Sequence, residues 1–209
     1  MRNPETIQAK FLMVLSIPFA MILFPACAEA HLNSTGLGPF YDGLAHFLLS
    51  PEDFIPVLAL ALLAGQRGAA YGRRVLFILP AAWLLGGFIG LAGTATGGTA
   101  LACISFLLLG GLLAADAKVS LQALTGLSAL VGVFHGYLNG TGMGPPRDAL
   151  LVLLGLVFPV FVLVAIAAAF VVGLRQQWAR IAVRVVGSWI VASGLLLLGW
   201  AARSGLITK

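Results

Sequence analysis

Histidines, acids and an asparagine within long apolar stretches are the residues of this sequence that could carry chemistry. The stretch VFHGYLNGTGMG, residues 133–144, contains His135 and Asn139, which are four positions apart and therefore share one face of a helix. Further upstream, His46 is followed by Ser-Pro-Glu-Asp at 50–53. Imidazole binds nickel, cobalt, copper and zinc, and carboxylates extend such a ligand set. The pattern predicts a site for a divalent transition metal.

The candidate metal ligands form one set, in which the acids supply charge and the carboxamide is a weak or indirect ligand: His31, His46, Glu52, Asp53, His135 and Asn139. A structural role is open for most of them. Ser50 suits the N-cap and Pro51 the first turn of a helix, where two acids would simply face the positive end of the helix dipole. A buried histidine can likewise do no more than bond to a neighbouring helix.

Other chemistry finds little support in the sequence. It contains no P-loop, no G-x-S-x-G and no H-E-x-x-H motif, and no nucleophile–base pair is evident, so we do not expect an enzyme. The formal net charge of +5 comes from basic residues scattered at helix ends, which does not indicate nucleic-acid binding. The expected partners are a metal ion and the lipid bilayer.

The composition is that of a membrane protein. Of the 209 residues, 60% are hydrophobic and 9% are charged, whereas a soluble domain has roughly 25% charged residues. So few charges cannot cover a surface that faces water. We therefore predict an all-α fold, a polytopic membrane helical bundle.

Residues 1–30 read as a secretory signal peptide. A positive start and an apolar core precede Ala28-Glu29-Ala30, which forms a cleavage site. Cleavage would leave 31–209 as a single transmembrane domain with His31 at its amino terminus, where the α-amino group and the imidazole could chelate a metal. It would also remove one of the two cysteines, so no disulfide is expected. The alternatives are an uncleaved first helix and a histidine that merely follows the cleavage site.

Six apolar segments are candidates for membrane spans, which need about 20 residues to cross a hydrocarbon core of about 30 Å. They cover residues 51–66, 74–93, 98–116, 120–139, 148–173 and 181–202. Residues 39–49 extend the first span, but Pro51 interrupts it because proline cannot continue a helix from upstream. Interrupted membrane helices line cavities or pack within protein, and they often mark ligand sites. We expect about six transmembrane helices, the first broken near Ser50-Pro51.

The span predicted at 120–139 carries a stripe of small residues beside His135. Gly132, Gly136 and Gly140 are spaced by four positions. Such a stripe lets another helix approach closely. The histidine is therefore expected to lie near a second helix.

Lysine and arginine set the expected orientation. Seven basic residues fall on one side of the membrane and three on the other: Arg67, Arg73, Arg74, Lys118, Arg175, Arg180 and Arg184 against Arg147, Arg203 and Lys209. The more basic side faces the cytoplasm. This predicts a multi-pass protein of the bacterial inner membrane with a periplasmic mature amino terminus. The histidines then lie toward the outer face.

The two histidine segments resemble the motifs of the HupE/UreJ family, small membrane proteins with a signal peptide and about six spans. The first family motif is H-x5-D-H, and here His46 is followed by Glu52 and Asp53 at its last two positions. The second motif is F-H-G-x-A-H-G-x-E, of which Phe134-His135-Gly136 and Gly140 are kept. The resemblance covers most of the mature chain, and it implies a role in supplying nickel or cobalt to hydrogenase or urease.

Three ligand positions depart from these motifs. Asp53 stands where the second histidine of the first motif belongs, and Asn139 and Gly142 replace the histidine and the glutamate of the second. A carboxamide is a weaker ligand than imidazole for such metals, and glycine offers no side-chain ligand. The site is therefore richer in oxygen, and it should hold nickel more weakly or favour another metal.

Two functions remain open from the sequence. The first is a HupE/UreJ-like protein that binds a divalent transition metal on the periplasmic side and passes it inward, with nickel or cobalt expected first and copper or zinc as alternatives. The second is a non-transporting membrane subunit or assembly factor of a metalloenzyme complex, which the changed ligand positions favour. The sequence carries no nucleotide-binding motif, so transport would be facilitated, ion-coupled or driven by a partner.

Overall fold

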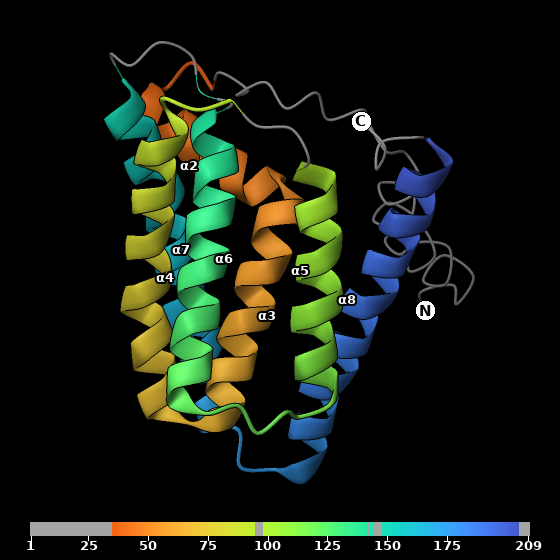
Figure 1. Cartoon of the computed structure of the whole chain (residues 1–209). Coiled ribbons are helices and arrows are strands. Elements are labelled where there is room, and N and C mark those ends of the chain that lie inside the picture. The colour runs from red at the N-terminus through yellow and green to blue at the C-terminus, as the bar shows by residue number, and fades with distance from the viewer. Residues whose placement is uncertain (1–34, 95–97, 142, 144–147, 205–209) are drawn as a thin grey trace, which may run out of the picture. The chain divides into compact units, whose positions relative to one another are not determined.

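The described part of the chain consists of α-helices and contains no β-strand. The computed structural model describes residues 35–94, 98–141, 143 and 148–204. The helices, labelled as in Figure 1, are α2 (Pro39–Leu49), α3 (Pro51–Arg67), α4 (Ala69–Gly90), α5 (Gly98–Ala114), α6 (Leu121–Thr141), α7 (Ala149–Gly173) and α8 (Gln177–Arg203). Helices α3 to α8 run side by side, and α2 lies at one end of the bundle, in contact with α7. The predicted all-α fold is confirmed.

The predicted break between the first two helices is present. Helix α2 ends at Leu49, α3 begins at Pro51, and the two meet at an angle of 73°. Ser50 has the extended backbone of an N-cap, and its carbonyl accepts hydrogen bonds from the amides of Asp53 and Phe54. Its side chain makes no capping hydrogen bond. The break therefore depends on proline at the first helical position rather than on the serine hydroxyl.

Among the described residues, four helices are long and apolar enough to cross a membrane, namely α4, α6, α7 and α8, and the bent pair of α2 and α3 can add a fifth span. The remaining predicted span, α5, has 17 residues and lies at the short end of the range for a crossing helix. It stops at Ala114, and the chain then turns at Asp116, whose φ of 49° cannot continue a right-handed helix. The described residues thus form the helices of a multi-pass membrane protein: four or five full-length spans and the shorter α5, which together account for the six predicted apolar segments.

Glycines bring the helices together in close pairs. At Gly136 in α6 a Cβ atom would overlap the backbone oxygen of Trp83 in α4. Gly155 in α7 approaches the backbone of Phe40 in α2 in the same way, and Gly187 in α8 approaches that of α5. The pairs α4–α6, α5–α8 and α2–α7 form the largest helix contacts in the described chain. The expected role of the glycine stripe on α6 is confirmed.

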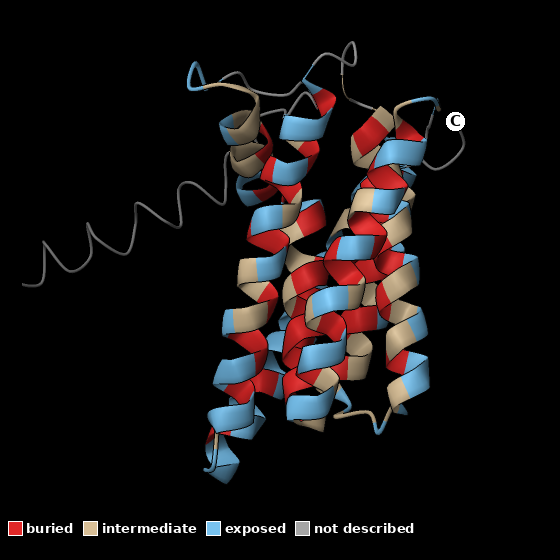
Figure 2. Ribbon diagram, turned by 90° about the vertical axis from the view of Figure 1, so that its left-hand side faces the viewer, coloured by how far each residue is buried: buried red, intermediate tan, exposed pale blue. Residues whose placement is uncertain are grey.

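Helix α3 runs through the inside of the bundle and contacts each of the other described helices. Val57, Leu60 and Leu63 are completely buried. Figure 2 shows the buried positions turned inward and the exposed ones along the outer faces of the helices. Large apolar side chains such as Trp189 and Leu196 are exposed on those faces. Exposed apolar surface of this kind is typical of helices that face lipid.

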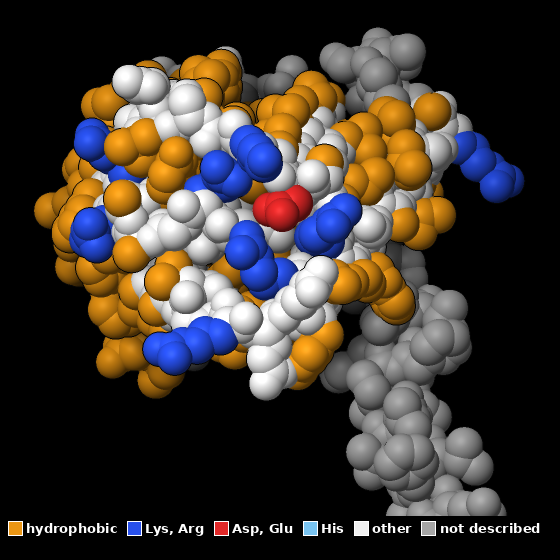
Figure 3. All heavy atoms as spheres, turned by 90° about the horizontal axis from the view of Figure 1, so that it is seen from below, with side chains coloured by type: hydrophobic (Ala, Val, Ile, Leu, Met, Phe, Trp, Pro, Cys, Tyr) orange, Lys and Arg blue, Asp and Glu red, His pale blue; other side chains and the backbone are white. Residues whose placement is uncertain are grey.

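The end of the bundle opposite α2 is strongly basic. Basic residues end α3, begin α4, follow α5 and α7, and lie in the first turns of α8: Arg67, Arg73, Arg74, Lys118, Arg175, Arg180 and Arg184. Figure 3, which looks onto this end, shows lysine and arginine side chains gathered on it, with acidic colour between them. The seven basic residues expected on one side of the membrane therefore lie at one end of the bundle.

Some of the sequence-based predictions fall outside the described residues. These are the signal peptide at 1–30 with its cleavage site, His31, and the glycine at position 142. They stay predictions, as does the single domain at 31–209.

Candidate metal site

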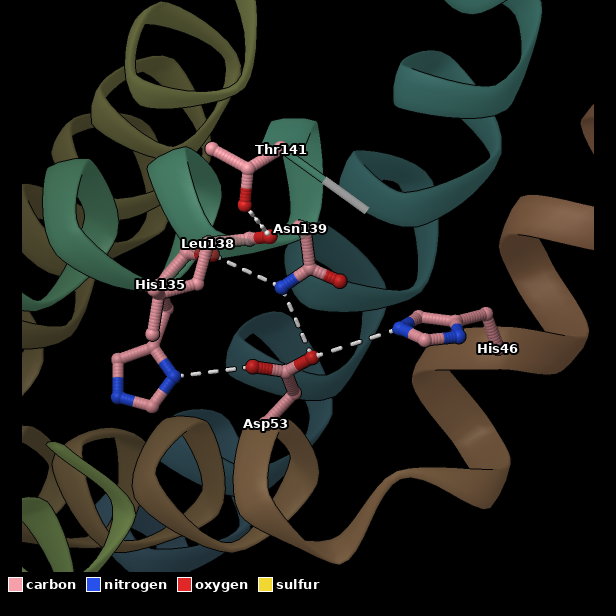
Figure 4. A network of polar contacts seen from close by, with 6 residues as sticks. All are labelled: His46, Asp53, His135, Leu138, Asn139 and Thr141. Carbon is pink, nitrogen blue, oxygen red and sulfur yellow. Dashed lines mark hydrogen bonds and ion pairs between the residues drawn. The ribbon is translucent and has the colours of Figure 1, made fainter. Parts of the chain in front are cut away.

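A buried carboxylate in the first turn of α3 is the centre of the candidate site. Asp53 is 4% exposed. Removing an ion from water costs several kcal/mol, so a carboxylate buried to this extent has to be paired or hydrogen-bonded. Figure 4 shows three side chains turned toward it, from α2 and α6: His46, His135 and Asn139.

His135 makes the first of these contacts. Its Nδ1 lies 2.9 Å from Oδ1 of Asp53, and its Nε2 lies 2.9 Å from the hydroxyl oxygen of Ser105 on α5. An ionised carboxylate only accepts hydrogen bonds, so Nδ1 carries a proton and donates it. The ring of Trp83 stacks on the imidazole, with 5.5 Å between the centroids. The imidazole is thus held through both nitrogens and against one face.

Asn139 makes the second contact, one turn further along α6. Its Nδ2 donates to Oδ2 of Asp53 at 2.9 Å and to the carbonyl oxygen of His135 at 2.8 Å. Both partners are acceptors, so the amide nitrogen has to face them, and the orientation of the amide group is determined. Its Oδ1 is then buried and has no hydrogen-bond partner within the described residues. A buried acceptor of this kind is available to a cation.

His46 faces the same carboxylate from α2. Its Nε2 lies 4.0 Å from Oδ2 of Asp53, which is too long for a hydrogen bond, and its side chain is 22% exposed. The broken span is the reason for this approach, because the bend of 73° between α2 and α3 turns His46 back toward the first turn of α3. The network therefore joins both helices of the bent pair to α6.

The sequence as a whole decides the family. The HupE / UreJ protein family matches residues 19–197, which is most of the chain. The chain belongs to the HupE / UreJ family. This is a family of membrane proteins with accessory or transport roles related to nickel and cobalt. Searches of curated proteins and of solved structures gave no match.

The two HupE / UreJ motif regions meet in the structure. The first supplies His46 and Asp53 and the second supplies His135 and Asn139, so four of the predicted ligands form one network. Glu52 is not part of it, because this side chain is exposed in the first turn of α3. That is the place expected of a simple helix-start acid. The acid that aligns with the aspartate of the family motif points outward, and the one at the histidine position points inward.

Ser105 is a member of this network that the sequence analysis missed. It lies midway along the apolar helix α5 and is 5% exposed. With His135 and Asp53 it forms the Ser–His–Asp order of hydrogen bonds that hydrolases use, so a nucleophile–base pair exists although none was evident in the sequence. The hydroxyl is buried between helices, which suits it to hold the imidazole rather than to meet a substrate. A serine in the middle of an apolar segment was the available signal.

The network is not a complete metal site by itself. Within the described residues, no three His, Cys, Asp or Glu side chains are arranged to hold a metal ion. His46 and Asp53 are 4.0 Å apart, however, so an ion between their facing atoms could contact both. Figure 4 shows the amide oxygen of Asn139 on the same side as His46. The arrangement can therefore offer a divalent cation one imidazole, one carboxylate and one amide oxygen.

Proposed function

We propose that this HupE / UreJ family member binds a divalent transition metal, with nickel or cobalt first, and carries it across the membrane. The observation that supports this most is the buried carboxylate of Asp53, toward which two histidines and an asparagine are turned. Ionisable residues inside membrane bundles are rare and mark ion pathways. The relation of the family to nickel and cobalt supports the same cargo.

The proposed direction is inward across the bacterial inner membrane. The network lies near the end of the bundle that carries α2, and the seven basic residues lie at the opposite end. Basic ends of membrane proteins face the cytoplasm. The ion would enter from the periplasm, on the side of the mature amino terminus left by cleavage after residue 30.

Metal uptake into proteoliposomes tests the proposal. Ni²⁺ should accumulate in vesicles that contain the parent protein. His46→Ala and His135→Ala should each lower the initial rate about 10-fold or more, because changes next to metal-binding groups cost about 10–100-fold. Glu52→Gln is the control, since this neighbouring acid is exposed and outside the network. It should keep the rate of the parent.

Equal uptake by the parent and by both histidine variants, each purified in folded form, would refute transport through this network. A parent that takes up no metal but co-purifies with a metalloenzyme complex would favour the second candidate function, a non-transporting subunit or assembly factor. The observation in favour of that function is the incomplete metal site in the described part of the chain.

Substitutions at Asn139 should change the affinity for nickel in opposite directions. Asn139→His should raise it about 10-fold, or about 1.4 kcal/mol, because imidazole is the better nickel ligand. Asn139→Leu should lower it, because this change removes both the amide oxygen and the donor to Asp53. Calorimetric titration of the detergent-purified proteins with nickel measures both effects. Identical affinities in all three proteins would contradict a role of Asn139 at the metal.

A further inference from the structure

We propose that Ser105 is a positioning residue that keeps His135 away from the metal, so that His46, Asp53 and Asn139 alone hold the ion. This inference rests on the proposed function, because it assigns the ligands of the same site. Ser105 lies on α5, outside both histidine motifs, and its hydroxyl is the only contact from that helix to the network among the described hydrogen bonds.

The imidazole of His135 has no lone pair on the side of the site. Nδ1 carries the proton that is donated to Asp53, so the lone pair of the neutral ring is on Nε2. Nε2 accepts a hydrogen bond from Ser105 at 2.9 Å, and Figure 4 shows this nitrogen on the edge of the ring that points away from Asp53. An ion beside Asp53 cannot reach it while the ring keeps this position.

The hydroxyl and the packing together hold the ring in place. Trp83 stacks on the imidazole with an interplanar angle of 30°, and His135 is 2% exposed. If the Ser105 hydroxyl were absent, Nε2 would be a buried acceptor without a partner, which is unfavourable. A ring released from that bond gains by turning its lone pair toward a nearby cation. The hydrogen bond from Ser105 therefore keeps His135 as a partner of Asp53 and prevents it from becoming a metal ligand.

On the opposite side of Asp53 lie further atoms that could bind a cation. Oδ2 of Asp53 and Nε2 of His46 are 4.0 Å apart. This distance is close to twice the metal–ligand distance of about 2.0–2.2 Å for nitrogen and oxygen ligands. Oδ1 of Asn139 is buried without a partner in the described chain, and it points to this side. Three possible ligand atoms from three helices thus lie on this side of the network, and one of the three belongs to an imidazole.

The electron paramagnetic resonance spectrum of bound copper(II) gives the number of coordinated imidazoles, because each coordinated imidazole nitrogen adds its own coupling to the signal. The chain contains three histidines, so a His31→Ala background leaves two. In that background, the purified full chain loaded with Cu²⁺ should show one imidazole. His46→Ala should remove this coupling, and His135→Ala should leave it in place.

The serine variants test the positioning role in the same background. Ser105→Ala should show two coordinated imidazoles, and Ser105→Thr, which keeps the hydroxyl, should show one. Ser128→Ala is the matched control, because Ser128 is also buried but donates to the Leu124 carbonyl in its own helix. It should show one imidazole.

The possible results separate the inference from the proposed function. Two imidazoles in the His31→Ala protein, one of them lost in His135→Ala, would overturn the inference and leave metal binding intact. If one imidazole is coordinated both in the His31→Ala protein and after Ser105→Ala is added to it, Ser105 does not keep His135 away from the metal. No bound copper at all would refute the proposed function, and the ligand assignment with it. If Ser105→Ala does not fold, the two histidine variants still decide the ligand set.

Discussion

Replacing Asp53 with asparagine should abolish metal binding and uptake while the helices keep their places. The change removes one negative charge and almost no volume. Asp53 supplies the one carboxylate of the described network, and both of its oxygens are used there. Since the loss of a group that merely supports a ligand costs about 10–100-fold, the loss of the charged ligand should lower nickel affinity by more than about 100-fold. Calorimetric titration and vesicle uptake measure it.

The same variant should be less stable without metal. The carboxylate accepts one hydrogen bond from His135 and one from Asn139, on different oxygens. An amide has one oxygen, so one of these donors would face an NH₂ group and stay unsatisfied. Leaving a buried polar group without a partner costs about 1–3 kcal/mol. We expect a lower thermal unfolding midpoint in detergent, measured by intrinsic fluorescence.

Glu52→Gln makes the same chemical change at the adjacent residue. Glu52 is exposed, and substitutions at such positions usually alter stability by no more than about 0.5 kcal/mol. Nickel affinity and the unfolding midpoint should therefore match those of the parent. An equal loss of nickel binding in both variants would mean that the ion meets the outer acid, and that Asp53 is a structural partner of His135.

The helices and the break in the first span could be predicted because they depend on local composition. Pro51 separates α2 from α3 at the expected residue, and long apolar runs locate the spans. The boundaries differ where the sequence becomes basic. Helix α4 begins at Ala69, whereas the apolar run begins at 74, because Arg73 and Arg74 can extend a helix beyond the hydrocarbon core. Hydropathy locates the part of a helix within the membrane, not its ends.

Which of the two adjacent acids faces inward could not be predicted. Neighbouring residues on a helix point about 100° apart, so Glu52 and Asp53 cannot both face the network. The residues four positions later, Pro56 and Val57, are both buried. Because α3 is apolar on nearly all sides, its sequence pattern does not identify one inner face. The direction of Asp53 follows from the packing of α3 among the other helices.

The pairing of Ser105 with His135 was hidden for a related reason. The two residues are 30 positions apart, and α5 has no charged residue that would draw attention to it. A serine in a membrane helix commonly bonds to a carbonyl of its own helix, as Ser128 does. The sequence alone does not distinguish these cases. The difference depends on how closely α5 approaches α6, which is a property of the assembled bundle.

Gly136→Ala should destabilise the bundle and disturb the metal site together. A Cβ atom there would overlap the backbone oxygen of Trp83, whose ring stacks on His135. A backbone atom cannot rotate away as a side chain can, so α4 and α6 would have to separate. Overpacking of this kind costs about 1–3 kcal/mol, and sometimes more. We expect a lower unfolding midpoint in detergent and weaker nickel binding, although residue 136 carries no ligand.

Gly126→Ala on the same helix isolates the effect of the close contact. An added Cβ atom at Gly126 meets nothing within 4 Å, and alanine favours the helix over glycine by about 1 kcal/mol. This variant should keep or raise the unfolding midpoint and bind nickel as the parent does. The two substitutions are chemically identical. If Gly136→Ala lowers the unfolding midpoint and Gly126→Ala does not, the difference comes from the close contact between α4 and α6 at Gly136. If Gly136→Ala instead unfolds and binds nickel like the parent, the two helices have room for a methyl group and His135 does not depend on Trp83.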